Sequence, residues 1–134
     1  MVEFSLIAVM LVIVLLAIVE MGRMVLVYTT VANAARAGAR YAIVHGGERT
    51  GSGATGPSGP GSTTQVQTVV KNFASAGLLN TSNLTITVSY PNGLNTAGSL
   101  VSVTVTYPYD PLLPYFSTIL STTLGSTSEG VITF

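Results

Sequence analysis

The side chains able to do acid–base or nucleophilic chemistry are few and widely spaced. The chain has one histidine, His45, and its acids are Glu3, Glu20, Glu48, Asp110 and Glu129. Catalysis by paired carboxylates or by a histidine-based triad needs such groups in a shared constellation, and the spacing offers none. The absence of cysteine excludes disulfides, thiolate metal sites and cysteine nucleophiles. The sequence therefore predicts neither an enzyme nor a site for a metal or cofactor.

A glycine motif in the middle of the chain resembles a nucleotide-binding loop in letters only. Gly51, Gly53 and Gly56 match G-x-G-x-x-G, but that fingerprint needs a strand before it and a helix opening within it. Here a long helical pattern precedes the motif and prolines follow it. Net charge is zero and there is no basic patch to neutralise phosphates. We therefore predict that residues 46–64 form a Gly/Ser/Pro loop that is not a nucleotide-binding site. The charge balance predicts that the chain has no nucleic-acid partner.

Three further ionisable side chains have a simple expected role. Glu20 and Arg23 stand three residues apart, a spacing at which helical side chains can pair. Because each would cost about 2.5–3.5 kcal/mol at the centre of a bilayer, we expect this ion pair to mark the outer edge of the apolar segment. His45 follows the long helical pattern and is expected to interact with the helix C-terminal dipole.

Glu3 allows two interpretations. A carboxylate in the first turn favours the N-terminal helix dipole, so Glu3 can simply be an interfacial cap. The alternative is that it pairs with the free amino terminus of a neighbouring subunit in an apolar environment, since a buried charge needs such a partner.

Glu3, Glu20 and Arg23 belong to an unusually long predicted helix. Residues 6–19 contain no polar side chain, and a helical pattern continues to residue 44. Residues 3–44 would span about 63 Å, far more than a bilayer core of about 30 Å. A basic leader region and an A-x-A cleavage site are not evident, so a secretory signal is not expected. The length favours a helix that leaves the membrane and packs into a polymer through the following candidate assembly residues: Glu3, Phe4, Leu6, Leu11, Leu15 and Val19.

The second half of this helix is amphipathic and rich in small residues. Ala35, Gly38 and Ala42 recur on one face, where they would let another backbone approach closely. This face either covers the sheet of the same chain or contacts a neighbouring copy, and both can hold.

The sequence of residues 65–134 predicts a small α+β head. Residues 65–76 have a helical pattern that Thr63 or Thr64 could cap, and residues 84–90 and 100–107 alternate as strands. Residues 128–134 are expected to form a third strand, and the Pro-broken segment after Pro108 a loop or short helix. The predicted organisation is an assembly helix over residues 1–45, the loop over 46–64, and a head over 65–134 that packs on the C-terminal half of the helix. The fold class is α+β, with a long hydrophobic helix, a short helix and a three-stranded antiparallel sheet.

The N-terminal sequence resembles the TadE-like pilin and pseudopilin family of bacterial tight-adherence systems. The resemblance rests on the V-E-F start, on E-x-G-R at residues 20–23 and on N-A-A-R-x-G-A-R-Y at residues 33–41, with a strand-then-proline segment at residues 101–116. It implies a precursor cut by a prepilin peptidase, insertion in the bacterial inner membrane, and assembly through the helix by the pilus machinery into a cell-surface filament. The family's functional acid corresponds to Glu3.

Three functions follow as hypotheses. The first is a structural subunit of an extracellular type IV pilus-like filament, a homopolymer built from the N-terminal helices. The second is a minor, membrane-anchored pseudopilin that primes or tips a pilus without forming its shaft. The third is a binding module on a membrane tether.

Overall fold

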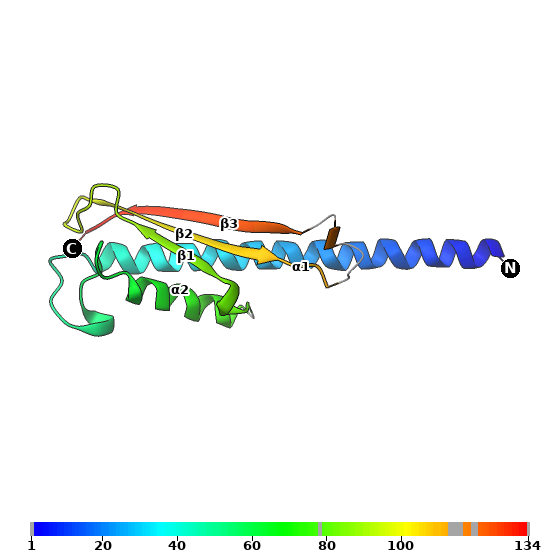
Figure 1. The fold of residues 1–134 in the computed structure, drawn as a ribbon, viewed down its shortest axis with the longest axis horizontal. Coiled ribbons are helices and arrows are strands. Elements are labelled where there is room, and N and C mark those ends of the chain that lie inside the picture. Colours follow the sequence, from blue (N-terminus) through cyan, green and yellow to red (C-terminus); the bar gives the residue numbers. More distant parts are fainter. Residues whose placement is uncertain (1, 78, 113–116, 119–120, 134) are drawn as a thin grey trace.

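The computed structural model describes residues 2–77, 79–112, 117–118 and 121–133. One long helix, α1 (Val2–Val44), dominates the molecule, and its C-terminal half carries a small head while its N-terminal half projects away alone (Figure 1). Its 43 residues correspond to a rod of about 65 Å. The α+β fold predicted from the sequence is confirmed.

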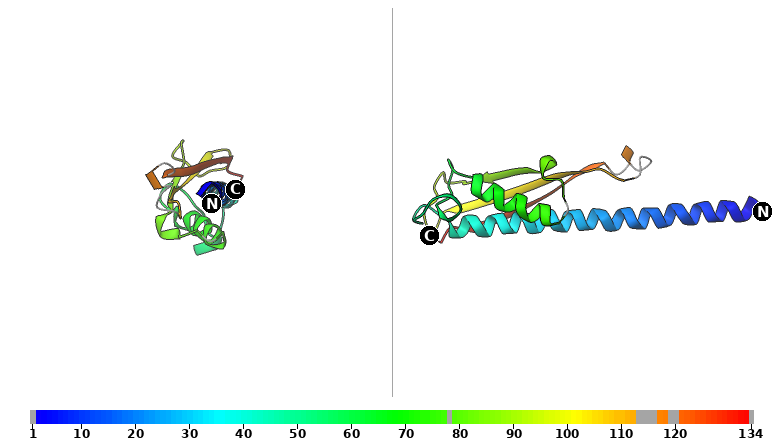
Figure 2. Two further views of the ribbon diagram at one scale, coloured as in Figure 1. Left: turned by 90° about the vertical axis from the view of Figure 1, so that its right-hand side faces the viewer. Right: turned by 90° about the horizontal axis from the view of Figure 1, so that it is seen from below.

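The head consists of a sheet and a second helix that pack around the C-terminal half of α1. The helix α2 (Thr64–Ala76) and the strands β1 (Thr85–Ser89), β2 (Leu100–Tyr109) and β3 (Thr122–Val131) follow in chain order. The strands form an antiparallel sheet in the order β1-β2-β3. The end-on view in Figure 2 shows the sheet on one side of α1 and α2 on another, and α1 contacts α2, β2 and β3.

The core follows the periodicities of the sequence. From α1, the small and β-branched residues at helical spacing are buried, and Val66, Val70 and Ala74 of α2 meet them. The alternating residues Val101, Val103 and Val105 of β2 complete the core from the sheet, as the strand pattern predicted. Where α1, α2 and β2 meet, the core is thus built mainly from alanine and valine side chains, which lets these three elements pack closely.

β1 is one residue shorter at each end than predicted, and the larger differences are in β2 and β3. The third strand begins at Thr122 instead of residue 128 and ends at Val131. Residues 122–128 alternate no apolar side chains, so their sequence gave no strand signal; they are ordered by pairing with β2, where the Thr104 and Thr127 hydroxyls hydrogen-bond at 2.9 Å. Residue 134 lies outside the described residues.

β2 also continues through Pro108 to Tyr109, two residues beyond the predicted end. Proline is disfavoured in a central strand because it lacks an N–H. Pairing with β1 stops at Thr106, however, so at Pro108 the strand has β3 alone as its partner. Half of the segment expected to form a loop or short helix after Pro108, residues 113–116 and 119–120, lies outside the described residues.

The connections contain more local structure than predicted. Thr63 takes the N-cap position of α2, but its side chain makes no capping hydrogen bond. In the glycine-rich loop, Gly53–Thr55 forms a 3₁₀ turn whose Ala54 carbonyl accepts a 2.7 Å hydrogen bond from the Tyr41 hydroxyl. The loop therefore includes regular structure and is attached to α1.

Candidate assembly surface and the helix–head junction

The N-terminal half of α1 is an apolar rod exposed on all sides. Its most apolar stretch of 18 residues has a mean hydropathy of 3.0, and none of it is buried. By length and composition the helix is suited to cross a membrane. The predicted assembly residues Phe4, Leu6, Leu11, Leu15 and Val19 are all among its exposed apolar side chains. We call residues 2–19 the naked half.

Glu3 lies in the first turn of the naked half and is exposed. It is the one charged side chain of this stretch. No packing against the head surrounds it, so any partner in an assembled state has to come from another molecule.

Glu20 lies where the naked half meets the head, and it is buried. Its side chain is only 4 % exposed, while Arg23 Nη1 donates to Glu20 Oε1 at 3.1 Å. The structure therefore places the two residues together, as their spacing predicted. It does not place Glu20 at a solvated edge: the end of β2 covers it. We call the cluster of Glu20, Arg23 and Tyr109 the junction cluster.

Tyr109 and the chain after it provide the cover. The Tyr109 hydroxyl donates to Glu20 Oε1 at 2.5 Å, and the backbone N–H of Leu112 donates to the same oxygen at 3.3 Å. Arg23 Nη2 donates to the Asp110 carbonyl at 2.8 Å, and its guanidinium lies 5.0 Å from the centroid of the Tyr109 ring. Both helix residues are thus tied to a segment nearly ninety residues later in the chain.

The junction cluster also alters the acidity of the phenol. Burial is the main cause that raises the pKa of Tyr109 to about 12, and its hydrogen bond to Glu20 and the Glu20 charge raise it further, whereas Arg23 opposes them. Sequence reasoning missed Tyr109 because the predicted strand ended before Pro108. The signal was present: residues 101, 103, 105, 107 and 109 continue one alternation across the proline.

The small-residue face of α1 packs on the protein's own head. Ala35 and Ala42 are fully buried. A Cβ at Gly38 would clash with Val70 of α2 and come within 3.2 Å of Val103 Cγ1 on β2. Within one copy, then, this face brings α2 and β2 close to the helix axis.

His45 lies just beyond the C-terminal end of α1. Its Nδ1 is 2.9 Å from the Tyr41 carbonyl, and its ring stacks on the Tyr41 ring with centroids 3.9 Å apart. The His45 carbonyl in turn accepts hydrogen bonds from the backbone N–H and the hydroxyl of Ser58. His45 thus ends the helix and fixes the start of the loop.

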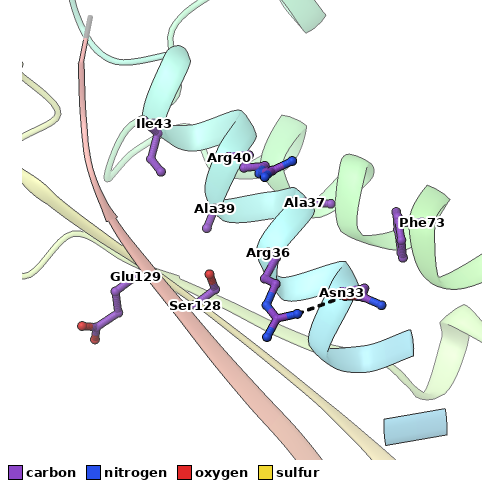
Figure 3. A pocket seen from close by; sticks show the side chains of 9 residues that line it. All are labelled: Asn33, Arg36, Ala37, Ala39, Arg40, Ile43, Phe73, Ser128 and Glu129. Atoms are coloured by element: carbon purple, nitrogen blue, oxygen red, sulfur yellow. Dashed lines mark hydrogen bonds between the residues drawn. The ribbon is translucent and has the colours of Figure 1, made fainter. Parts of the chain in front are cut away.

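A groove runs along the part of α1 that neither α2 nor the sheet covers. We call it the α1 groove; its volume is about 730 Å³, and Figure 3 shows its lining. Asn33, Arg36, Ala37, Ala39, Arg40 and Ile43 come from α1, Phe73 from α2, and Ser128 and Glu129 from β3. The spacing of Asn33, Arg36 and Arg40 puts them on one side of a helix, but the walls of the groove depend on tertiary packing.

No curated protein and no solved structure matches the chain. One family does match, and it matches the part of α1 that contains the naked half, both residues of the ion pair and both arginines of the groove. The match confirms the resemblance read from the residues: residues 1–40 of the chain match the family described as TadE-like protein.

Proposed function

We propose that the chain is a structural subunit of an extracellular type IV pilus-like filament and assembles through its N-terminal helix. The observation that carries the proposal is the naked half of α1, whose most apolar stretch has none of its residues buried in the described part of the structure. An apolar surface of this size is unstable in water and has to be covered by lipid or by protein. The same helix can be surrounded by lipid before assembly and by protein afterwards.

Before assembly, the naked half spans the bacterial inner membrane with the head outside it. Residues 2–19 correspond to about 27 Å of helix, close to the thickness of a bilayer core. A prepilin peptidase and the pilus assembly machinery are the partners that a TadE-like helix suggests. In the filament, the naked halves of neighbouring copies replace the lipid.

Leu11→Ala/Leu15→Ala tests this role in the full chain in its bacterial host. The double variant loses side-chain contacts between helices, yet its apolar stretch remains suited to membrane insertion. We expect normal amounts in the membrane fraction and fewer filaments that contain this chain, counted by negative-stain microscopy of sheared cell-surface material with antibody labelling. Leu94→Ala is the matched control, because it also removes an exposed leucine side chain, but from the head.

The wild-type chain decides between a shaft subunit and a minor pseudopilin. Long fibres labelled along their length, and composed of this chain, support the proposal. Labelling confined to fibre tips, or retention of the chain in the membrane while unlabelled fibres form, overturns it.

A further inference from the structure

The α1 groove holds positive charge that the chain itself does not neutralise. Among the described residues, the one ion pair is between Glu20 and Arg23. Arg36 Nη1 donates to the Asn33 side chain at 3.3 Å, and Arg40 forms no ion pair within the described part of the chain. Figure 3 shows the Glu129 carboxylate on the opposite side of β3 from both arginines. An acidic side chain from outside would complement this groove.

A lipid headgroup does not suit this position. Arg36 lies 16 residues beyond Glu20 along α1, which is about 24 Å along the helix axis. With the naked half in a membrane, the arginines therefore stand well above the headgroup layer. Two arginines are also too few for a nucleic-acid surface. Another protein segment with a single acid fits better.

The groove lies on the same side of α1 as part of the naked half. At about 100° per residue, Phe4, Leu11, Leu15 and Ile18 all fall within about 60° of Arg36 around the helix. Val25, on the same side between them, is 61 % exposed although the head has already begun there. A helix packed along this side of α1 thus follows one uninterrupted uncovered surface into the groove.

The lining of the groove matches the start of the naked half. Ala37 and Ala39 form a shallow floor that lets a helix approach, and Ile43 and Phe73 offer apolar contacts to it. The naked half is apolar and has one acid, Glu3, in its first turn. An incoming carboxylate would therefore meet two arginines that no acid of the described residues pairs with.

We propose that the α1 groove receives the first turn of α1 from a second copy of this chain, with Glu3 of that copy paired to Arg36 and Arg40. The inference rests on the proposed filament and names a contact within it. For parallel copies, the pairing requires an axial offset of 33–37 residues, or about 50–55 Å. It gives Glu3 a partner other than a neighbouring amino terminus.

Charge reversal in the full chain tests the pairing. We expect Glu3→Arg alone, and Arg36→Glu/Arg40→Glu alone, each to lower filament yield about tenfold or more, since each leaves like charges in an apolar contact. Combining them restores the opposite charges and is expected to bring the yield back to within about threefold of wild type. Lys71→Glu is the control: this exposed α2 residue does not line the groove, and its variant keeps wild-type yield.

Cross-linking tests the geometry independently of yield. Because the chain has no cysteine, a Val2→Cys/Ala37→Cys double variant has no competing thiol. On oxidation of filaments we expect a ladder of covalent oligomers, whereas Val2→Cys/Lys71→Cys gives none. Circular dichroism of each variant verifies that the head is folded.

The results separate the pairing from the filament itself. Wild-type yield from Arg36→Glu/Arg40→Glu, or no ladder from the Val2→Cys/Ala37→Cys filaments, overturns the groove contact and leaves the filament proposal standing. If the wild-type chain enters no filament, both fall. A defect in Glu3→Arg that the arginine reversals do not repair assigns Glu3 to a different partner and likewise overturns the groove contact.

Discussion

At the residue scale, Glu20 is a carboxylate buried where the naked half ends, and one oxygen accepts from a guanidinium, a phenol and a backbone N–H. Burying a charge is costly unless it is paired and hydrogen-bonded, so these donors are what make the position tolerable. The i,i+3 spacing was enough to predict the pair with Arg23. Its burial could not be predicted, because the covering strand comes from residues 109–112.

Tyr109→Phe measures what the phenol contributes. The change removes one donor from a buried carboxylate and leaves the ring in place, so we expect the free energy of unfolding to fall by about 1–3 kcal/mol. Urea denaturation in a non-ionic detergent gives this value. Tyr107→Phe is the matched control on the same strand, because Tyr107 is half-buried and its hydroxyl has no hydrogen bond within the described residues; we expect a change within about 0.5 kcal/mol. Equal effects at the two sites would show that the Glu20 contact is not special.

The raised pKa of Tyr109 predicts a loss of stability in alkaline solution. The ordinary tyrosine pKa is 10.0 and that of Tyr109 is about 12, so the folded protein holds this proton more tightly than the unfolded chain. The contribution is complete below about pH 10 and is lost as the pH rises toward 12. Burial also raises the pKa of Tyr90, so the informative quantity is the difference between wild type and Tyr109→Phe. That difference should shrink from pH 9 to pH 12, and a constant difference would contradict the assigned pKa.

At the scale of elements, prediction succeeded where one side-chain period determined the structure. Alternation located β1 and the core of β2, and helical spacing gave α1 and α2 nearly to the residue. It failed where an element depends on its neighbours. β3 is polar and is defined by pairing with β2, and Pro108 is tolerated because β1 ends first. The α1 groove was beyond sequence reasoning for the same reason, since three elements enclose it.

Gly38 tests how closely the elements pack. A Cβ at this position meets Val70 and Val103, so Gly38→Ala overpacks a rigid contact between α1, α2 and β2. We expect a loss of about 1–3 kcal/mol in the free energy of unfolding, in spite of the better helix propensity of alanine. Gly22→Ala on the same helix has open space at the Cβ position and should be neutral or stabilising by up to about 1 kcal/mol. Chemical denaturation of both variants gives the comparison. A harmless Gly38→Ala would mean that α2 can move away at little cost.

At the scale of the whole molecule, one continuous helix serves two regions with opposite requirements. Its C-terminal half is packed into the head, while the naked half is exposed around its circumference. The junction cluster separates the two. Folding of the head and covering of the naked half should therefore be independent processes. This suits the filament subunit proposed above, which would exchange lipid for protein contacts without refolding.

This independence predicts opposite outcomes for two truncations in α1. Val31 is fully buried in the head, so Val31→Ala loses apolar burial and leaves a cavity, and we expect it to lower the free energy of unfolding by about 2 kcal/mol. Leu15 is exposed in the naked half, so Leu15→Ala should change the same quantity by less than about 0.5 kcal/mol. Both are measured on the full chain in the same detergent by urea denaturation, followed by circular dichroism. Hydrogen exchange gives a second readout: Val31→Ala should speed amide exchange throughout the head, and Leu15→Ala should leave it unchanged. If Leu15→Ala destabilised the head as much as Val31→Ala, the two halves of α1 would be energetically coupled, and the exchange of lipid for protein around the naked half would have to act on the fold of the head as well.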